Sequence, residues 1–281
     1  VNWILEADIV SFFDSVDRTA LIEMLQTRVA DGSLLRLIGK CLQVGVLDGA
    51  EFTRPEIGTA QGSVLSPILG NVYLHYVLDL WFETEVKPRM RGKVTLIRYC
   101  DDFIIGFERE DDARRVMAVL GKRLGRFGLA PHPDKTLLLP FRRPPEGQRD
   151  GQGPATFDFL GFTLYWRRSR KGWWSMQCKT RRASLRRAVQ SVTDWCRCHR
   201  HLPVGAQHAA LHRRLQGHFN YFGVNGNFRS LLLLVEATKR VWYKWLCRRS
   251  QRGRLTWARF RALLERFPLP RPRITVQIWG T

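Results

Sequence analysis

The chain has 281 residues, 44% of them hydrophobic, and a formal net charge of +21. This length allows one large domain or two smaller ones, each with a sizeable core. No apolar run approaches the roughly 20 residues that a membrane-spanning helix needs, so we expect no membrane partner. The six cysteines are scattered and no secretory signal pattern is recognised, which argues against a disulfide framework.

The positive charge is concentrated in the second half of the chain. Residues 1–140 contain 17 Lys and Arg against 19 Asp and Glu, and residues 141–281 contain 29 against 6. Solubility alone does not need so one-sided a distribution. Basic residues interleaved with aromatic ones suit a phosphate backbone and unstacked bases, so nucleic acid is the expected partner.

The predicted elements alternate short apolar strands with amphipathic helices. In chain order they are a strand around Asp8, a helix over 19–29, a strand ending at Asp48-Gly49, a long helix from Gln61-Gly62 through Trp81, a hairpin over 96–107 and a helix over 111–127. The Pro- and Gly-rich residues 144–154 form a connector that loops out between two strands.

Three basic helices are predicted next, over 181–200, 207–221 and 231–249. Their apolar faces carry the aromatic residues Trp195, Phe219, Trp242 and Trp245. An aromatic stripe at helical spacing is usually core, so these side chains are assigned to packing.

Two adjacent carboxylates, Asp101 and Asp102, interrupt the apolar run of the predicted hairpin. Like charges in the middle of a buried strand repel each other and resist desolvation unless a cation neutralises them. Asp8 lies in a second short apolar stretch, residues 4–13. Three carboxylates from two strands can hold two Mg²⁺ ions about 3.5–4 Å apart, the arrangement that drives in-line phosphoryl transfer. A solvated turn is the weaker interpretation, because apolar residues flank the pair on both sides.

Four motifs, in order, resemble those of group II intron reverse transcriptases. The sequence YCDD at 99–102 resembles the family's Tyr-x-Asp-Asp motif, and residues 8–17 closely resemble its first palm motif. Residues 58–74 are similar to the next motif, and FDFLGF at 157–162 is similar to the primer-grip hairpin. The resemblance implies an α+β fold, a reverse-transcriptase palm with an antiparallel sheet packed with helices, followed by an α-helical thumb or maturase domain.

The same resemblance implies three parts. They are a palm with a remnant of the fingers over 1–175, a helical thumb and maturase-specific domain over 176–250, and a basic C-terminal tail over 251–281. Because the first residues lead almost directly into the first catalytic strand, we expect a fragment that lacks the N-terminal fingers region.

The resemblance also assigns a metal site. Asp8, Asp101 and Asp102 are the expected catalytic ligands of two Mg²⁺ ions, with the Ile9 carbonyl completing a coordination shell and Mn²⁺ as a substitute. For two further carboxylates, Asp14 and Asp17, helix capping is the preferred explanation.

Phe13, Gln61, Gly62 and Lys135 are the expected nucleotide-binding residues. Phe13 would lie beneath the incoming sugar, where a bulky apolar face excludes a 2′-hydroxyl. Gln61 and Gly62 would form the floor beneath the nascent base pair. Lys135 would neutralise the leaving pyrophosphate or donate a proton to it.

Two further groups would bind polynucleotide. Phe159, Leu160 and Gly161 are the expected primer grip. A basic cluster for intron RNA is expected at Arg181, Arg182, Arg186 and Arg187. The Cys and His residues at 196–201 form a single compact cluster without the separated ligand pairs of a zinc finger, so no zinc site is expected.

These assignments predict an RNA-directed DNA polymerase of the group II intron type. Its partners would be an RNA template, a DNA primer, dNTPs and the intron RNA, whose splicing and retrohoming it would assist. We expect a bacterial, cytoplasmic and nucleoid-associated protein, and a homodimer is left open.

Three alternatives compete with this prediction. An RNA-binding splicing cofactor with vestigial polymerase activity is disfavoured by the intact carboxylate set. A domesticated or defence-associated reverse transcriptase stays open, although the maturase-like helices favour the intron type. A template-dependent RNA polymerase is disfavoured by Phe13.

Overall fold

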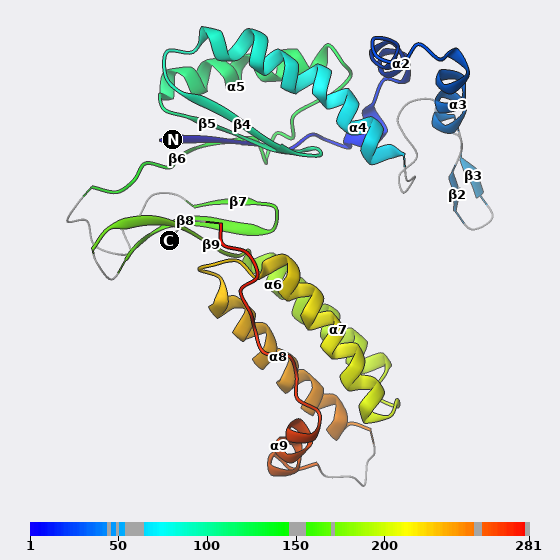
Figure 1. The fold of residues 1–281 in the computed structure, drawn as a ribbon, viewed down its shortest axis with the longest axis vertical. Helices are drawn as coiled ribbons and strands as arrows, with labels where there is room; N and C mark the ends of the chain where they lie inside the picture. Colours follow the sequence, from blue (N-terminus) through cyan, green and yellow to red (C-terminus); the bar gives the residue numbers. More distant parts are fainter. Residues whose placement is uncertain are drawn as a thin grey trace. The chain divides into compact units, whose positions relative to one another are not determined.

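The computed structural model describes residues 1–43, 46–48, 51–53, 65–145, 156–169, 172–249 and 255–278. The predicted Gln61 and Gly62, and most of the connector at 144–154, lie outside these residues. The chain forms two compact units, Val1–Phe157 and Asp158–Thr281 (Figure 1). The three-part division at residues 175 and 250 stays a prediction.

Unit 1 is built on a four-stranded antiparallel sheet with the order β4-β5-β1-β6. The strands are β1 (Trp3–Ala7), β4 (Val94–Tyr99), β5 (Asp102–Phe107) and β6 (Leu137–Pro140). In β5 every residue after Asp102 is buried, as expected for a strand near the centre of a sheet. Because Ala7 pairs with Phe103, the residues that follow β1 and precede β5 lie at the same end of the sheet.

Helices pack on this sheet and close the core. They are α4 (Ser66–Leu74), the π-helical turns η1 (His75–Asp79) and η2 (Phe82–Val86), the 3₁₀ turn η3 (Lys87–Arg89), and α5 (Glu110–Gly125). Helix α5 packs against β1, β5 and β6 (Figure 1). Fully buried side chains such as Leu5, Tyr73 and Phe103 form one continuous apolar core.

Smaller elements complete unit 1. They are α1 (Phe12–Ser15), α2 (Arg18–Gln26), α3 (Gly32–Leu42), β2 (Val46–Asp48) and β3 (Glu51–Thr53). Asp17 caps α2, since its carboxylate accepts hydrogen bonds from Thr19 N at 2.8 Å and Ala20 N at 3.1 Å. The predicted capping role of Asp17 is confirmed.

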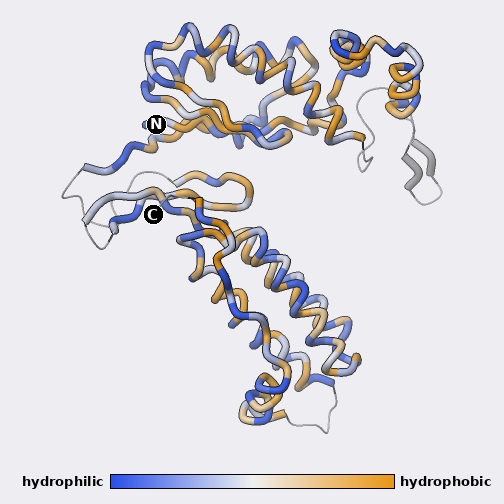
Figure 2. Tube along the Cα trace, viewed as in Figure 1, coloured by the Kyte–Doolittle hydropathy of each residue, from blue (hydrophilic) through white to orange (hydrophobic). Residues whose placement is uncertain are grey.

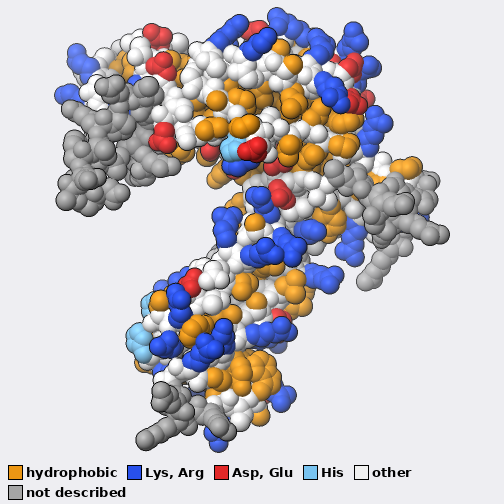
Figure 3. Space-filling model, turned by 180° about the vertical axis from the view of Figure 1, so that it is seen from behind, with side chains coloured by type: hydrophobic (Ala, Val, Ile, Leu, Met, Phe, Trp, Pro, Cys, Tyr) orange, Lys and Arg blue, Asp and Glu red, His pale blue; other side chains and the backbone are white. Residues whose placement is uncertain are grey.

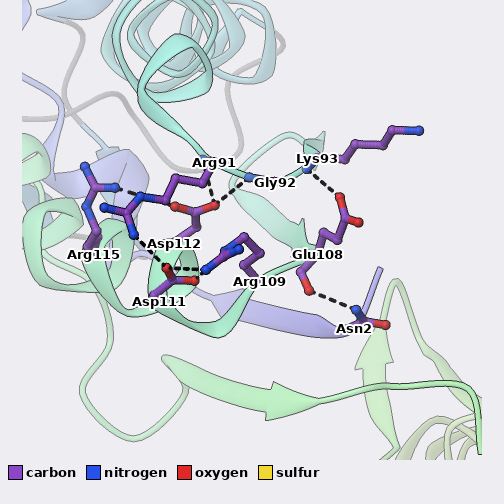
Figure 4. Close-up of polar contacts among 9 residues, drawn as sticks. All are labelled: Asn2, Arg91, Gly92, Lys93, Glu108, Arg109, Asp111, Asp112 and Arg115. Carbon is purple, nitrogen blue, oxygen red and sulfur yellow. Dashed lines mark hydrogen bonds and ion pairs between the residues drawn. The ribbon is translucent and has the colours of Figure 1, made fainter.

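The end of the sheet opposite the carboxylates is fixed by Glu108, which directly follows β5, and by Asp112 of α5 (Figure 4). The buried Asp112 carboxylate accepts hydrogen bonds from Arg91 N at 3.0 Å and Gly92 N at 2.9 Å. Glu108 Oε2 accepts another from Lys93 N at 2.9 Å. These bonds tie the first turn of α5 to the chain that enters β4, so the hairpin is anchored at its base.

Unit 2 begins with a three-stranded sheet of β7 (Phe157–Phe159), β8 (Phe162–Arg168) and β9 (Trp174–Thr180). Four helices follow, α6 (Arg182–Cys198), α7 (Val204–Phe222), α8 (Phe228–Cys247) and α9 (Trp257–Arg266). Hydrophobic and hydrophilic residues alternate along α6, α7 and α8, as in amphipathic helices (Figure 2). The predicted α+β fold is confirmed.

The aromatic residues of unit 2 form its core. Phe219 and Trp242 are fully buried, and Trp195 and Trp245 pack against the cluster that contains Trp242. Their assignment to packing is therefore confirmed. Among the described residues, no helix is long and apolar enough to cross a membrane.

Helix α9 departs from the sequence-based expectation, which assigns residues 251–281 to a basic tail. Thr256 caps this helix by accepting a hydrogen bond from Arg259 N at 3.3 Å. Phe260 is fully buried and its ring lies edge-on to Trp242, at 5.8 Å between centroids. The sequence does contain a pattern that is typical of a helix, a Thr followed by apolar residues at helical spacing. The surrounding arginines obscure this pattern.

Candidate active site

The predicted acidic pair lies at the tip of the β4–β5 hairpin. Tyr99 pairs with Asp102, so Cys100 and Asp101 form a two-residue turn. Cys100 has a φ of 55°, in the left-handed region that such tight hairpin turns require. The turn therefore places two consecutive carboxylates where the strands leave the sheet.

Asp8 reaches the same end of the sheet through its own backbone pairing. It follows β1 directly, its carbonyl accepts a hydrogen bond from His132 N at 2.7 Å, and Val10 N donates to Ala130 O at 2.9 Å. This pairing brings the segment after α5 alongside Asp8. As a result, Lys135 Nζ donates a hydrogen bond to Asp8 Oδ2 and forms an ion pair with it.

The three carboxylates and Lys135 influence one another electrostatically. The pKa of the Asp102 carboxyl is raised, first by partial burial and then by the negative charges of Asp101 and Asp8, while Lys135 acts to lower it. The charged form of Asp102 is therefore less favourable than that of an isolated carboxyl. A divalent cation between these groups would relieve that penalty.

The donor set fits a hard divalent cation, because carboxylate oxygens are the ligands that Mg²⁺ prefers. Within the described ranges, however, no three Asp, Glu, His or Cys side chains are gathered closely enough to hold a metal ion. Shared coordination of one ion would require the carboxylates to approach one another. It would also require Lys135 to yield part of its hold on Asp8.

Phe13 lies five residues after Asp8 and packs on α4. Its ring contacts Phe12 at 5.1 Å between centroids, with an angle of 60°. A Cβ atom at Gly70 would lie 2.8 Å from Phe12 Cε1 and 3.2 Å from Phe13 Cε1. Gly70 is therefore required for α4 to approach both rings, and only the half-buried Phe13 keeps an exposed edge.

Of the predicted primer-grip residues, Phe159 ends β7, and Leu160 and Gly161 form the β7–β8 turn of unit 2. Leu160 and Gly161 both have positive φ, 49° and 78°, as a two-residue hairpin turn of type I′ requires. Tyr221 Oη donates a hydrogen bond to Leu160 O at 2.9 Å. The backbone N of Arg181 donates to Gly161 O at 2.8 Å. The turn is thus held by elements of its own unit.

The predicted basic cluster divides into two environments. The Arg181 side chain forms an ion pair with Asp158 at 2.9 Å, so it supports the strand that leads into the β7–β8 turn. Arg182, Arg186 and Arg187 are exposed on α6. Lys and Arg side chains are spread over unit 2 with few acidic ones among them (Figure 3).

Two of the Cys and His residues at 196–201, Cys196 and His199, contribute to packing, whereas Cys198 and His201 are exposed. Cys196 is buried, and burial raises the pKa of its thiol to about 12. The ring of His199 stacks on Trp195 at 4.7 Å between centroids.

The sequence did not reveal one residue at the end of the unit 1 sheet that carries Asp101 and Asp102. Arg98 lies two residues before Cys100 and donates hydrogen bonds to Asp79, Asn71 and the Cys100 carbonyl. The available signal was a charged residue within an otherwise apolar strand. Its partners lie on α4 and η1, which the spacing around the acidic pair does not reveal.

Comparison with known proteins gives a consistent family assignment. The profile of the family described as reverse transcriptase (RNA-dependent DNA polymerase) matches residues 1–164. The group II intron-encoded protein LtrA of Lactococcus lactis subsp. cremoris is 38% identical over 132 residues, which cover 43% of this chain and 22% of LtrA. An uncharacterized 91 kDa protein in the cob intron of Schizosaccharomyces pombe is 41% identical over 115 residues, 39% of this chain and 14% of that protein.

These matches span less than a quarter of each relative's own length. A telomerase structure from Candida albicans, in complex with a fragment of telomeric RNA, matches 94% of this chain and 44% of its own, with a TM-score of 0.48 and 13% identity.

Proposed function

Because the chain belongs to the reverse transcriptase (RNA-dependent DNA polymerase) family, we propose that it is an RNA-directed DNA polymerase of the group II intron type. The observation that carries the proposal is the common position of Asp8, Asp101 and Asp102 at one end of the four-stranded sheet, where the first and second lie close enough to raise the pKa of the third. A merely structural acidic turn would not need a third carboxylate from another strand.

Reverse transcriptases use divalent metal ions. In this chain Asp8, Asp101, Asp102 and the Ile9 carbonyl would hold two Mg²⁺ ions, with Mn²⁺ as a substitute. When bound, the ions would lower the pKa of the primer 3′-hydroxyl and neutralise charge on the triphosphate.

The remaining groups would hold the substrates. Lys135 is already at the site through its ion pair with Asp8. From there its ammonium group can neutralise the leaving pyrophosphate or donate a proton to it. Phe13 would exclude the 2′-hydroxyl and select dNTPs, and Gln61 and Gly62 would lie beneath the new base pair.

The polynucleotide partners would be an RNA template and a DNA primer, whose end Phe159, Leu160 and Gly161 would hold. The exposed arginines of α6 would meet intron RNA, and this binding would assist splicing and retrohoming in the bacterial cytoplasm. The homology with intron-encoded proteins supports this part of the proposal.

The test is primer extension on an RNA template, with dNTPs and Mg²⁺, by the full-length protein that contains this chain. Asp101→Asn and Asp102→Asn should each lower the extension rate by about 100- to 1000-fold, comparable to losing one electrostatic stabiliser of a transition state. RNA affinity should stay within about twofold, because these side chains are few among the many groups that meet phosphates. Asp111→Asn is the matched control, since Asp111 is a half-exposed carboxylate that pairs with Arg109 at the other end of the hairpin.

Two outcomes would contradict the proposal. Extension retained in either variant would remove that carboxylate from the chemistry. A full-length wild-type protein that binds intron RNA tightly but does not extend a primer would indicate a splicing cofactor with vestigial polymerase activity.

A further inference from the structure

Arg98 makes hydrogen bonds with every nitrogen of its guanidinium group. Nε donates to Asp79 Oδ1 at 2.7 Å and Nη2 donates to Asp79 Oδ2 at 2.5 Å, a bidentate pair. Nη1 donates to Asn71 Oδ1 at 2.8 Å and to the Cys100 carbonyl at 2.9 Å. The side chain is 13% exposed. One rigid group therefore connects two helical elements to the turn that carries Asp101 and Asp102.

This turn is under two stresses that such a connection would resist. Cys100 is a non-glycine residue with positive φ, a conformation that residues with a Cβ atom rarely adopt because it is strained. The adjacent carboxylates of Asp101 and Asp102 that follow it also repel each other, because like charges lie side by side at the tip of the hairpin. A hydrogen bond from a cation to the Cys100 carbonyl holds the peptide that leads directly into Asp101.

We propose that Arg98 is a positioning residue, which holds the Asp101–Asp102 turn through the Cys100 carbonyl and is itself oriented by Asp79 and Asn71. The inference rests on the proposed function, because it assigns this clamp the task of keeping the two carboxylates in place for the metal ions. Arg98 acts through the turn and does not touch the reacting atoms.

The charge arrangement distinguishes this role from binding of the triphosphate. The Arg98 charge is compensated by a bidentate carboxylate, and its third nitrogen is occupied by Asn71 and by the turn. A guanidinium whose nitrogens are all hydrogen-bonded in this way holds its partners in place, and its charge is already compensated rather than offered to a triphosphate. Lysine cannot reproduce it, because an ammonium group lacks the planar fork that bonds Asp79 twice.

The backbone around Asp79 supports the assignment. Asp79 ends the π-helical turn His75–Asp79, which directly continues α4, the helix that contains Asn71. Single π-helical turns are rare and occur frequently at functional sites. Here the turn brings the Asp79 carboxylate and the Asn71 amide to the same guanidinium.

The experiment compares Arg98→Lys, Asp79→Asn and Asn71→Ala with the control Arg109→Lys in the full chain. Arg109 also forms a bidentate pair, with Asp111, but at the opposite end of the hairpin. Two measurements are made. Titration calorimetry gives the Mn²⁺ dissociation constant of the protein without nucleic acid. Primer extension gives the kcat and the KM for dNTP.

A positioning role predicts a specific pattern. Arg98→Lys should weaken Mn²⁺ binding and lower kcat, each by about 10- to 100-fold, the usual effect of losing a group that orients metal ligands. The KM for dNTP should change by less than about twofold. Asn71→Ala, which leaves the Arg98–Asp79 pair intact, should show the same pattern at about threefold. Arg109→Lys should change neither quantity.

Three results would overturn the inference. A raised KM with unchanged kcat and Mn²⁺ affinity would place Arg98 on the triphosphate. Unchanged Mn²⁺ affinity in a folded Arg98→Lys variant would reduce the clamp to a packing interaction. If Arg98→Lys does not fold, unchanged Mn²⁺ affinity in Asn71→Ala would lead to the same conclusion. Additive losses in Arg98→Lys combined with Asp79→Asn would show that the two residues act separately.

Failure of the proposed function has a different signature. A wild-type chain that binds Mn²⁺ but does not extend a primer would contradict polymerase activity, and the Mn²⁺ measurements would still test the clamp.

Discussion

Each unit contains a hairpin with a tight two-residue turn, and in both a side chain from outside the turn holds one of its carbonyls. In unit 1 the Cys100 carbonyl accepts from Arg98, which is 13% exposed and paired with Asp79. In unit 2 the Leu160 carbonyl accepts from the hydroxyl of Tyr221, which is 55% exposed. The first connection is ionic and largely buried, whereas the second is neutral and open to solvent.

The difference follows from what each turn carries. The unit 1 turn holds two like charges beside a third, so a neutral hydrogen bond would resist their repulsion poorly. Hydrogen bonds to charged groups are roughly twice as strong as neutral ones. The unit 2 turn carries no charge at Leu160 or Gly161, and it needs only to keep its backbone shape. Function at the unit 1 turn should therefore be most sensitive to substitutions that change charge. Function at the unit 2 turn should be most sensitive to substitutions that alter packing or polynucleotide contacts.

After the carboxylates themselves, the largest effect is expected at Lys135, the cation of the unit 1 site. Lys135→Met removes its ion pair with Asp8 and the positive charge that lowers the pKa of Asp102. Primer extension should fall by about 100-fold, as for loss of a general acid, with RNA affinity within about twofold. The matched control is Lys93→Met, which removes an exposed lysine at the base of the hairpin. Equal extension by the two variants would make Lys135 an ordinary surface cation.

A second prediction concerns the half-buried ring of Phe13. Phe13→Val should open space beneath the sugar and raise the ratio of ribonucleotide to deoxynucleotide incorporation by about tenfold or more, a typical value for relieving one steric clash. Phe12→Leu is the control, because Phe12 contacts the same Gly70 but is fully enclosed in the core. It should lower stability and leave the ratio unchanged. An unchanged ratio in Phe13→Val would assign Phe13 to the core alone.

The third prediction moves to the basic surface of unit 2. Replacing Arg182, Arg186 and Arg187 by Gln should weaken binding of structured RNA several-fold. It should also flatten the slope of log affinity against log salt by about 0.7–0.9 for each RNA phosphate that the protein no longer neutralises. Lys122→Gln with Arg126→Gln is the control, since both residues are cations on the surface of unit 1. Short-template extension should suffer less than RNA binding. An equal loss of both activities would mean that these arginines are not a separate RNA-docking surface.

Local patterns were sufficient to predict most elements and the centre of the site. The apolar run around Asp101 and Asp102 predicted the hairpin, and Asp17 was identified as a cap from its place before a helix. Both features depend on residues that are neighbours in the chain. The contact of Lys135 with Asp8 joins residues 127 positions apart, and only the family resemblance indicated that Lys135 belonged to the site.

The contacts of Arg98 and the packing of α9 were not predicted from the sequence, and the reasons are related. Arg98 meets Asp79 and Asn71 across 19 and 27 positions, and its pattern in the sequence is only that of one charge in a strand. The burial of Phe260 against Trp242 overcomes the basic composition of its segment. In both cases tertiary contacts decide the outcome, and hydropathy within a short window does not record them.

The smallest expected effect is a pH dependence of the stability of unit 2, through a histidine packed behind its turn. His218 on α7 stacks on Phe222 at 4.5 Å between centroids, and Phe222 in turn packs against Phe162, which follows the unit 2 turn. Burial lowers the pKa of His218 from 6.5 to about 4. The folded state therefore binds fewer protons than the unfolded state between these values. The stability contributed by neutral His218 is complete above the unfolded pKa of 6.5 and is lost as the pH falls towards 4.

His218→Gln removes the titrating group, so the variant should lose about 1 kcal/mol less stability than wild type between about pH 7 and pH 5. This is below the full linkage value, because the ring is only partly buried. Urea unfolding of unit 2, followed by tryptophan fluorescence at both pH values, measures the difference. His201→Gln, at an exposed position, should behave like wild type. If wild type and His218→Gln lose the same stability on acidification, His218 does not couple pH to the packing behind the β7–β8 turn.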